Sequence, residues 1–256
     1  MKLFDSHAHL QDDRVWNTCD MMISRAVDAG VGCIVCCGSS ESDWGRVRTL
    51  AEKYPQWVIP AFGVHPLYCE SISDAWYDML EELLRLYPHA AVGEIGLDHA
   101  IDKRNDYEQY TVFCAQLKLA CKLGRPVSIH CRKAWLALQN ALDNCGNLAA
   151  GGVIHSWSGA PDLIKIFLRY GLSISFSGAV TDEHNRRAYR SLLDVPIDKM
   201  LVETDTPDLP PYGRKVPNEP SFIIDVVKKI ADVKKLDYAF VAEKTYTNGL
   251  KLFAKS

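Results

Sequence analysis

The sequence lacks several features that would place it in a protein class at once. Its 256 residues contain no apolar run near the roughly 18 residues needed to cross a bilayer, and the N-terminal segment has no long apolar stretch of the kind found in signal peptides. The formal net charge is −3 and the isoelectric point is near 6.2, so there is no general basic excess of the kind that marks many nucleic-acid-binding proteins. We therefore expect a cytoplasmic protein that does not enter a membrane.

A disulfide framework is not expected either. The nine cysteines are an odd number, and the Cys-x-x-Cys spacing of Cys33 and Cys36, with Cys37 beside it, has no second pair downstream. These residues lie in Val31–Cys37, an apolar run typical of a buried strand, where a thiol behaves as a small hydrophobic group. We predict free thiols in a reducing compartment, and neither a zinc site nor a redox motif at these positions.

The chain also shows no linker, low-complexity segment or internal repeat, so we predict one domain over residues 1–256. What it does show is an alternation of short apolar runs with longer amphipathic segments, which is typical of βαβ units and a parallel sheet. The predicted strands are Lys2–Ser6, Val31–Cys37, Trp57–Gly63, Ala90–Glu94, Pro126–His130, Gly152–His155, Leu172–Ser177 and Lys199–Thr204.

Helical periodicity fills the intervals between these strands. The predicted helices are Asp20–Ala29, Asp43–Lys53, Ala75–Leu86, Asp106–Leu123, Ala134–Asn144, Pro161–Tyr170 and Asn185–Val195, with Pro220–Lys229 as the last helix. Eight strand–helix units in a chain of this length match a (β/α)₈ barrel (TIM barrel) of the α/β class. The alternative is an open doubly wound sheet, which would carry a glycine-rich phosphate loop after the first strand, whereas here that strand runs into His-Ala-His.

Histidine and carboxylate side chains gather where the predicted strands end. The first strand runs into Asp-Ser-His-Ala-His, and alternation along a strand puts Asp5, His7 and His9 on one side. Four later strands end at or next to one further such residue: Glu94, His130, His155 and Asp205. A single histidine at a strand end is ordinarily a hydrogen-bonded core residue. Five strand ends that meet at one face of a barrel, each with a metal-compatible group, indicate a site with enough ligands for two divalent cations.

The motifs around these residues resemble a known family. Asp-Ser-His-Ala-His-Leu, Gly-Val-His-Pro, Gly-Glu-Ile-Gly-Leu-Asp, Ile-His-Cys-Arg, His-Ser-Trp-Ser-Gly, Glu-Thr-Asp-Thr-Pro and Asn-Glu-Pro occur in this order. Each motif alone is weak, but the ordered set, which spans the chain from Phe4 to the final helix, resembles the TatD family of metal-dependent deoxyribonucleases in the amidohydrolase superfamily.

The resemblance implies a role for each of the six candidate ligands. His7, His9 and Asp205 would bind one metal, His130 and His155 would bind the second, and Glu94 would bridge the two. Asp205 would also act as the general base, so Asp205 and Glu94 are the predicted catalytic residues. The mixed set of imidazoles and carboxylates suits Zn²⁺ or Mn²⁺, and the family is commonly assayed with Mg²⁺, so we expect two divalent ions of one of these kinds.

The resemblance also implies residues around the metals. His65 and Arg132 would lie close to the substrate phosphate, and Asp98 and Glu203 would support the ligands from behind. Loops above the barrel would supply further contacts to single-stranded DNA. The candidates are Lys103, Arg104, Arg132, Lys133, Arg214 and Lys215, with Trp157 as a stacking surface for a base. We assign no role to His184.

The implied activity is metal-dependent hydrolysis of DNA phosphodiester bonds, from the 3′ end of single strands, by a monomer. Two alternatives stay open at this point. Because function depends on the loops, another hydrolase of the superfamily, acting on a small ester, amide or phosphoester, would have the same metal ligands. A non-catalytic barrel scaffold is the other alternative, although such proteins usually lose ligands and all six are present here.

Overall fold

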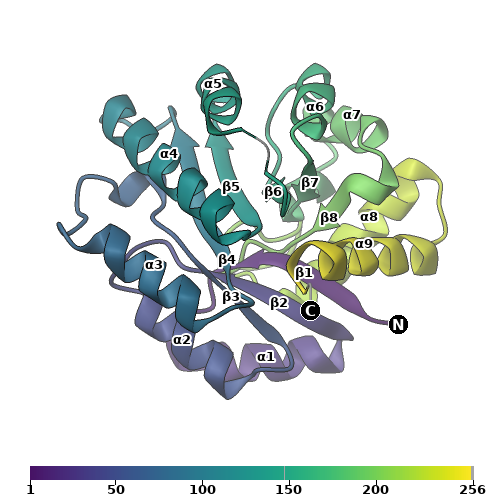
Figure 1. The fold of residues 1–256 in the computed structure, drawn as a ribbon. Coiled ribbons are helices and arrows are strands. Elements are labelled where there is room, and N and C mark those ends of the chain that lie inside the picture. The colour runs from purple at the N-terminus through teal and green to yellow at the C-terminus, as the bar shows by residue number, and fades with distance from the viewer. Residues whose placement is uncertain (147, 255–256) are drawn as a thin grey trace.

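The computed structural model describes residues 1–146 and 148–254, and its centre is a parallel sheet of eight strands in the order β1 to β8 (Figure 1). The strands are β1 Leu3–Ala8, β2 Val31–Cys37, β3 Val58–Phe62, β4 Ala91–Asp98, β5 Val127–Arg132, β6 Gly152–Ile154, β7 Leu172–Phe176 and β8 Met200–Val202. Each strand pairs in parallel with the next one along the chain. The prediction of a single-domain (β/α)₈ barrel is confirmed, and the open doubly wound sheet is excluded.

Helices surround the strands and connect each one to the next (Figure 1). They are α1 Cys19–Asp28, α2 Trp44–Lys53, α3 Trp76–Leu86, α4 Asp106–Leu123, α5 Trp135–Cys145, α6 Pro161–Leu168, α7 Arg186–Asp194, α8 Ile223–Lys234 and α9 Tyr238–Phe253. The first seven predicted helices are present within a few residues of their expected bounds. In the described part of the chain, no helix combines the length and apolarity required to cross a bilayer.

The expectation that Pro220–Lys229 is the last helix is wrong. Residues 220–222 form a short 3₁₀ helix, Pro220–Phe222, and α8 begins directly after it. A further helix, α9, follows α8. Asp237 caps α9, because its side chain accepts a hydrogen bond of 3.1 Å from the backbone N–H of Phe240. Eight strand–helix units are complete without α9, so the barrel pattern alone gave no reason to expect it.

The barrel closes between its first and last strands through the segment that follows β8. The backbone N–H of Asp205 donates to the carbonyl of His7 at 2.9 Å, and His9 donates to the carbonyl of Thr206 at 2.7 Å. Asp5 reinforces this seam, since its carboxyl group accepts from the backbone N–H of Thr204 at 2.9 Å and from its hydroxyl at 2.6 Å. Complete burial raises the pKa of Asp5 to about 8.

The thiols in β2 match their prediction. Cys33, Cys36 and Cys37 are free, and the last two are fully buried. Burial raises the pKa of Cys36 to about 12 and that of Cys37 well above its usual range, so neither thiol is primed to act as a nucleophile.

Candidate metal centre

The six predicted ligands converge at the carboxyl ends of five strands. β1 ends at His7 and His9, and the other candidates come from β4, β5, β6 and the segment after β8: Glu94, His130, His155 and Asp205. Three groups of donor atoms lie within 4.8 Å of one another: His7, His9 and Glu94; His7, His155 and Asp205; and Glu94 and His130 together with His65, which is not one of the six. Residues up to 198 positions apart along the chain therefore share one small volume, which is what the barrel predicts for strand ends.

Glu94 lies at the centre, and its two carboxylate oxygens face different partners. Oε2 lies 3.3 Å from Nε2 of His7 and 3.2 Å from Nε2 of His9. Oε1 lies 2.9 Å from Nδ1 of His130 and 2.8 Å from Nε2 of His155. Asp205 joins the first group, with Oδ1 3.7 Å from Nε2 of His9. We call His7, His9 and Asp205 the β1 set, and His130 and His155 the β5–β6 set.

The spacing of these atoms fits bound cations. Ligands held at about 2.0–2.1 Å from one Zn²⁺ lie roughly 3.0–3.4 Å from each other. Within the β1 set, Nε2 of His7 lies 3.1 Å from Nε2 of His9, and within the β5–β6 set, Nδ1 of His130 lies 3.2 Å from Nε2 of His155. One carboxylate oxygen adjoins each set, so Glu94 is positioned to bridge two cations. The donor chemistry also fits, because imidazole nitrogen with carboxylate oxygen suits Zn²⁺ and Mn²⁺.

The groups behind the histidines decide which ring nitrogen is free to bind a metal. Nδ1 of His9 lies 2.7 Å from the carbonyl of Cys37, and the remote nitrogens of the β5–β6 set face carboxylates. Nε2 of His130 lies 3.2 Å from Asp98, and Nδ1 of His155 lies 3.4 Å from Glu203. At His9 and His130 the acceptor retains the N–H there, which leaves a lone pair on the nitrogen beside Glu94 in the neutral ring. Nδ1 of His155 is buried without a hydrogen-bond partner among the described residues, so only the charge of Glu203 acts on that ring. Asp98 and Glu203 thus lie beside His130 and His155, and their supporting role stays a prediction.

His65 has the opposite arrangement. Its Nδ1 accepts a hydrogen bond of 3.2 Å from the backbone N–H of Leu67, so the proton of the neutral ring is on Nε2. Burial lowers the pKa of His65 to about 3, so the ring is neutral near pH 7. Nε2 lies 3.5 Å from Oε1 of Glu94, at the edge of the β5–β6 set. His65 thus presents an N–H donor, which suits a substrate oxygen better than a metal.

Burial and mutual charge set the protonation of the site before metal binds. Burial alone would raise the pKa of Glu94, but the surrounding histidines hold it well below its usual range. Burial opposes charge on His9 as well, yet Glu94 and Asp205 raise the pKa of that ring to about 9. Burial raises the pKa of Asp205 to about 7 and lowers that of His7 to about 4. Glu94 is therefore ionised, whereas His9 holds a proton that a cation must displace.

The expectation that Asp5 shares a side with His7 and His9 is wrong. The pairing of β1 with β2 shifts register between Asp5 and Ala8, which is the mark of a bulge. As a result, Ser6 and His7 both face across the barrel: Oγ of Ser6 lies 3.0 Å from Oγ of Ser175, and Nδ1 of His7 lies 2.9 Å from Oγ of Ser128. The bulge directs His7 to Glu94 and leaves Asp5 at the seam.

The turns above the strands adopt backbone conformations that few side chains accept. Lys133, Ser156 and Asp205, which follow β5, β6 and β8, have φ of 55°, 42° and 59°. Gly96 is required for a different reason, because a Cβ there would lie 2.0 Å from the carbonyl oxygen of His130. Left-handed conformations at residues other than glycine cluster at functional sites, where the surrounding structure enforces them.

Comparison with known proteins places the chain in a family. A family model described as TatD related DNase matches residues 4–254. The chain belongs to the TatD family. It is 31% identical over 252 residues to a Bacillus subtilis (strain 168) protein named uncharacterized metal-dependent hydrolase YabD, with 98% of each chain covered. It is also 31% identical over 257 residues to the 3'-5' ssDNA/RNA exonuclease TatD of Yersinia pseudotuberculosis serotype O:3 (strain YPIII), which covers 98% of this chain and 99% of the relative.

A solved structure of the family agrees with the fold. The crystal structure of YJJV, a TatD homolog from Escherichia coli K12, superposes with a TM-score of 0.93 at 29% identity and covers 99% of this chain and 98% of that one. The match of the family model and these relatives make the chain a metal-dependent hydrolase of the TatD family.

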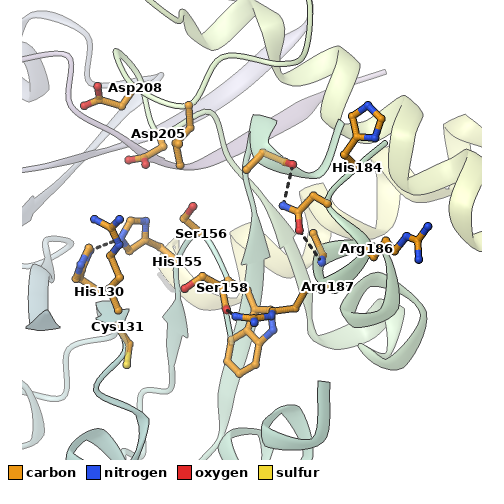
Figure 2. A pocket seen from close by; sticks show the side chains of 16 residues that line it. His130, Cys131, His155, Ser156, Ser158, His184, Arg186, Arg187, Asp205 and Asp208 are labelled. Atoms are coloured by element: carbon orange, nitrogen blue, oxygen red, sulfur yellow. Dashed lines mark hydrogen bonds between the residues drawn. The ribbon is translucent and has the colours of Figure 1, made fainter. Parts of the chain in front are cut away.

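In this TatD-family chain the metal centre opens into a groove of about 890 Å³ (Figure 2). At one end lie His130, His155 and Asp205, and at the other the N-terminal residues of α7. Figure 2 shows His184, Arg186 and Arg187 on that far wall. We did not expect a substrate role for these three residues from the sequence. The Arg-Arg pair at the start of a predicted helix was the only local signal, and it did not reveal that α7 borders the site.

The predicted substrate contacts divide into two groups. Arg132 lines the groove and is exposed, and its contact with the substrate phosphate stays a prediction. Other candidates are engaged elsewhere: Arg104 pairs with Asp106, and Arg214 pairs with Asp225 at 2.8 Å. The remaining candidates, Lys103, Lys133 and Lys215, are exposed. Nζ of Lys103 lies 3.6 Å from the carboxylate of Glu70.

The expectation that Trp157 stacks on a base is wrong. Its side chain is almost fully buried, with a ring centroid 4.8 Å from that of Trp135, and Nε1 donates to Oγ of Ser191 at 3.1 Å. The indole packs between α5 and α7 because its hydrogen-bond partner lies inside the protein.

Proposed function

We propose that this protein hydrolyses DNA phosphodiester bonds with two divalent cations and removes nucleotides from the 3′ end of single strands. The observation that carries the proposal is the division of the Glu94 carboxylate between two sets of metal-compatible donors at the end of a groove. The Yersinia relative named as a 3'-5' ssDNA/RNA exonuclease supports the substrate and the polarity. We further propose that the protein acts in the cytoplasm as a monomer.

The residues of the chain have distinct roles in this reaction. His7, His9 and Asp205 would hold one cation, His130 and His155 the other, and Glu94 both. When bound, such a pair lowers the pKa of water and offsets negative charge on the phosphoryl oxygens. Asp205, which lines the groove, would accept the proton of the attacking water as a general base.

The groups beside the metals would orient the substrate. His65 would donate its Nε2–H to a phosphate oxygen, and the Arg132 guanidinium at the groove wall would bind the same phosphate. Asp98 and Glu203 would keep His130 and His155 in their metal-binding orientation.

The test begins with removal of metal by a chelator. Mg²⁺ or Mn²⁺ is then restored, and 5′-labelled single-stranded DNA is digested. We expect activity only with metal, with products that shorten stepwise from the 3′ end. Asp205→Asn and Glu94→Gln should each reduce the rate at least about a hundredfold, because each removes a charge that acts directly on the reacting centre. Asp232→Asn, on the exposed face of α8, is the matched control and should behave as wild type.

The same assay separates the alternatives. DNA is compared with a panel of small esters and amides. A hydrolase of small esters or amides would cleave the panel faster than DNA, and a non-catalytic scaffold would cleave neither after metal is restored. Cleavage of DNA by Asp205→Asn and Glu94→Gln at the wild-type rate would contradict the proposed mechanism.

A further inference from the structure

We propose that α7 holds the nucleic acid strand beyond the scissile phosphate, and that Arg187 and Arg186 bind non-scissile phosphates there. This inference rests on the proposed function. The two arginines begin α7 on the wall of the groove opposite the metal centre, and both are exposed (Figure 2). A second surface hollow continues outward from the same side chains to Arg190, which lies one helical turn further along α7. We call Arg186, Arg187 and Arg190 the α7 arginines.

The groove is large enough to hold more of a substrate than one phosphate. Its volume of about 890 Å³ lies in the upper part of the range in which proteins enclose drug-sized ligands. The metal ligands occupy only one end. A strand with its terminal phosphodiester at Asp205 and His155 would therefore continue along the groove towards α7.

The α7 arginines belong to the six arginines that have no carboxylate partner in the described part of the chain, and Arg125 and Arg169, which do not line the groove, are also among the six. Within residues 1–146 and 148–254, seven of the thirteen arginines lie within 4.0 Å of a carboxylate: Arg14, Arg25, Arg46, Arg48, Arg85, Arg104 and Arg214. None of the three α7 arginines has such a partner in that part of the chain, and neither does Arg132 on the groove wall. Guanidinium groups without a carboxylate partner bind phosphate readily, since both their charge and their N–H donors are available.

The acidic groups near the groove do not cancel this charge. Asp208 lines the groove, but Arg14 binds both of its carboxylate oxygens, at 2.8 and 2.7 Å. Asp205 belongs to the β1 set. The far wall therefore presents net positive charge to the groove, although the whole chain has a net charge of −3. This local field favours an anionic polymer over a neutral substrate.

The start of α7 is fixed in place by its neighbours. Asn185 caps the helix by accepting from the backbone N–H of Ala188 at 3.1 Å, and its amide nitrogen donates to the carbonyl of Ala179 at 3.3 Å. Arg187 reaches across to the segment after β6, where Nη1 lies 3.4 Å from the carbonyl of Ser158. In Figure 2, Arg187 turns towards Ser158 and Arg186 turns outwards to the rim. We therefore infer that Arg187 binds the nearer phosphate.

The test compares long and short substrates with the metal-loaded enzyme. In the double variant Arg186→Ala/Arg187→Ala, we expect kcat/KM on a single-stranded 20-mer to fall about tenfold, and the salt dependence of log kcat/KM to become shallower by roughly 0.7 per lost phosphate contact. On a dinucleotide, which has no phosphodiester besides the scissile one, kcat/KM should change less than about twofold, since the metal centre is intact. The double variant Arg186→Lys/Arg187→Lys should recover part of kcat/KM on the 20-mer. It restores the positive charge but not the planar guanidinium that can bind one phosphate through two N–H groups.

Arg169→Ala is the matched control. Arg169 is exposed and has no carboxylate partner among the described residues, but it ends α6 away from the groove. It should leave both substrates unaffected. Equal losses on the 20-mer and the dinucleotide, or no loss on either, would overturn the inference and leave the proposed function standing.

Binding of a labelled 20-mer, measured by fluorescence anisotropy, separates the two proposals. If the wild type cleaves no DNA but binds the 20-mer, and the double variant binds it about tenfold more weakly, the proposed function fails and the α7 site stands. If the wild type neither binds nor cleaves the 20-mer, both fail.

Discussion

The histidines on the two sides of the Glu94 carboxylate have different groups behind their rings. On the Oε2 side, neutral groups lie behind the histidines: the carbonyl of Cys37 behind His9, and the hydroxyl of Ser128 behind His7. On the Oε1 side, the groups behind the rings are carboxylates, Asp98 behind His130 and Glu203 behind His155. The β1 set instead receives its second negative charge directly from Asp205, as a candidate ligand.

The difference shows how one site can bind cations and still admit an anionic substrate. Negative charge placed behind a ring strengthens the ligand without occupying a coordination position. His130 and His155 both line the groove, and His65 presents its N–H on the same side of Glu94. In the β1 set, Asp205 also lines the groove, and we propose it as the general base. We expect the substrate phosphate on the Oε1 side and proton transfer on the Oε2 side.

Glu94→Gln tests whether the two sides depend on one group, and it should have the largest effect. The amide retains the shape but removes the negative charge from both sets, and its NH₂ group would face one of them. We expect metal affinity at both positions to fall by more than about a hundredfold, since substitutions behind the ligands alone cost roughly 10–100-fold. Metal content by mass spectrometry after desalting measures this. Loss of only one of two bound metals would show that Glu94 does not bridge.

Asp98→Asn and Glu203→Gln test the carboxylate support of the β5–β6 set. Each should weaken metal binding at His130 and His155 by about 10–100-fold, while the β1 set retains its cation. Titration against a chelator should then show one position weakened and one unchanged. Equal weakening of both positions would remove the distinction between the two sides.

The pH dependence of metal binding tests the protonation of the β1 set. The pKa of His9 is raised to about 9 and that of Asp205 to about 7. Below these pH values each of the two side chains holds a proton that a cation must displace. Apparent affinity should therefore rise about tenfold per pH unit between pH 7 and 9, and more steeply below pH 7. Competition with a fluorescent chelator from pH 6 to 9 measures the slope. A flat profile would contradict the assignment of a protonated His9.

Ser128→Ala tests the neutral support of the β1 set and should have the smallest effect. It removes the hydroxyl 2.9 Å from Nδ1 of His7 but no charge. A neutral hydrogen bond contributes about 0.5–1.5 kcal/mol, so affinity at the β1 set should fall by no more than roughly tenfold. A loss as large as that of Asp98→Asn would show that the charge behind the ring is not what distinguishes the two sides.

Most of the fold could be predicted from the sequence because its signals are local. Apolar runs and helical periodicity are properties of neighbouring residues, and the bounds of Val31–Cys37 and Asp106–Leu123 agree with β2 and α4. Convergence of Glu94, His130 and His155 followed from the barrel alone, since strand ends meet at one face.

The features that escaped prediction depend on partners distant in sequence. The bulge in β1 arises from its pairing with β2, so simple alternation misplaced Asp5. The burial of Trp157 depends on Ser191 and Trp135, which come from α7 and α5. The position of Arg187 on the groove wall depends on how α7 packs, and no local pattern records that. The roles of Asp98 and Glu203 were expected from the family resemblance rather than from residue spacing.

The last helix has a consequence for how the chain can fold. Phe4 in the first strand stacks on Phe253 of α9, with ring centroids 6.1 Å apart, and a Cβ at Gly249 would lie 2.4 Å from the same ring. Leu252 and Phe253 also pack with Val35, Ala61 and Leu201 in one buried cluster. The floor of the barrel is thus built from both ends of the described chain. During synthesis on the ribosome, the first strand cannot complete its packing until residues 249–253 have emerged from the exit tunnel.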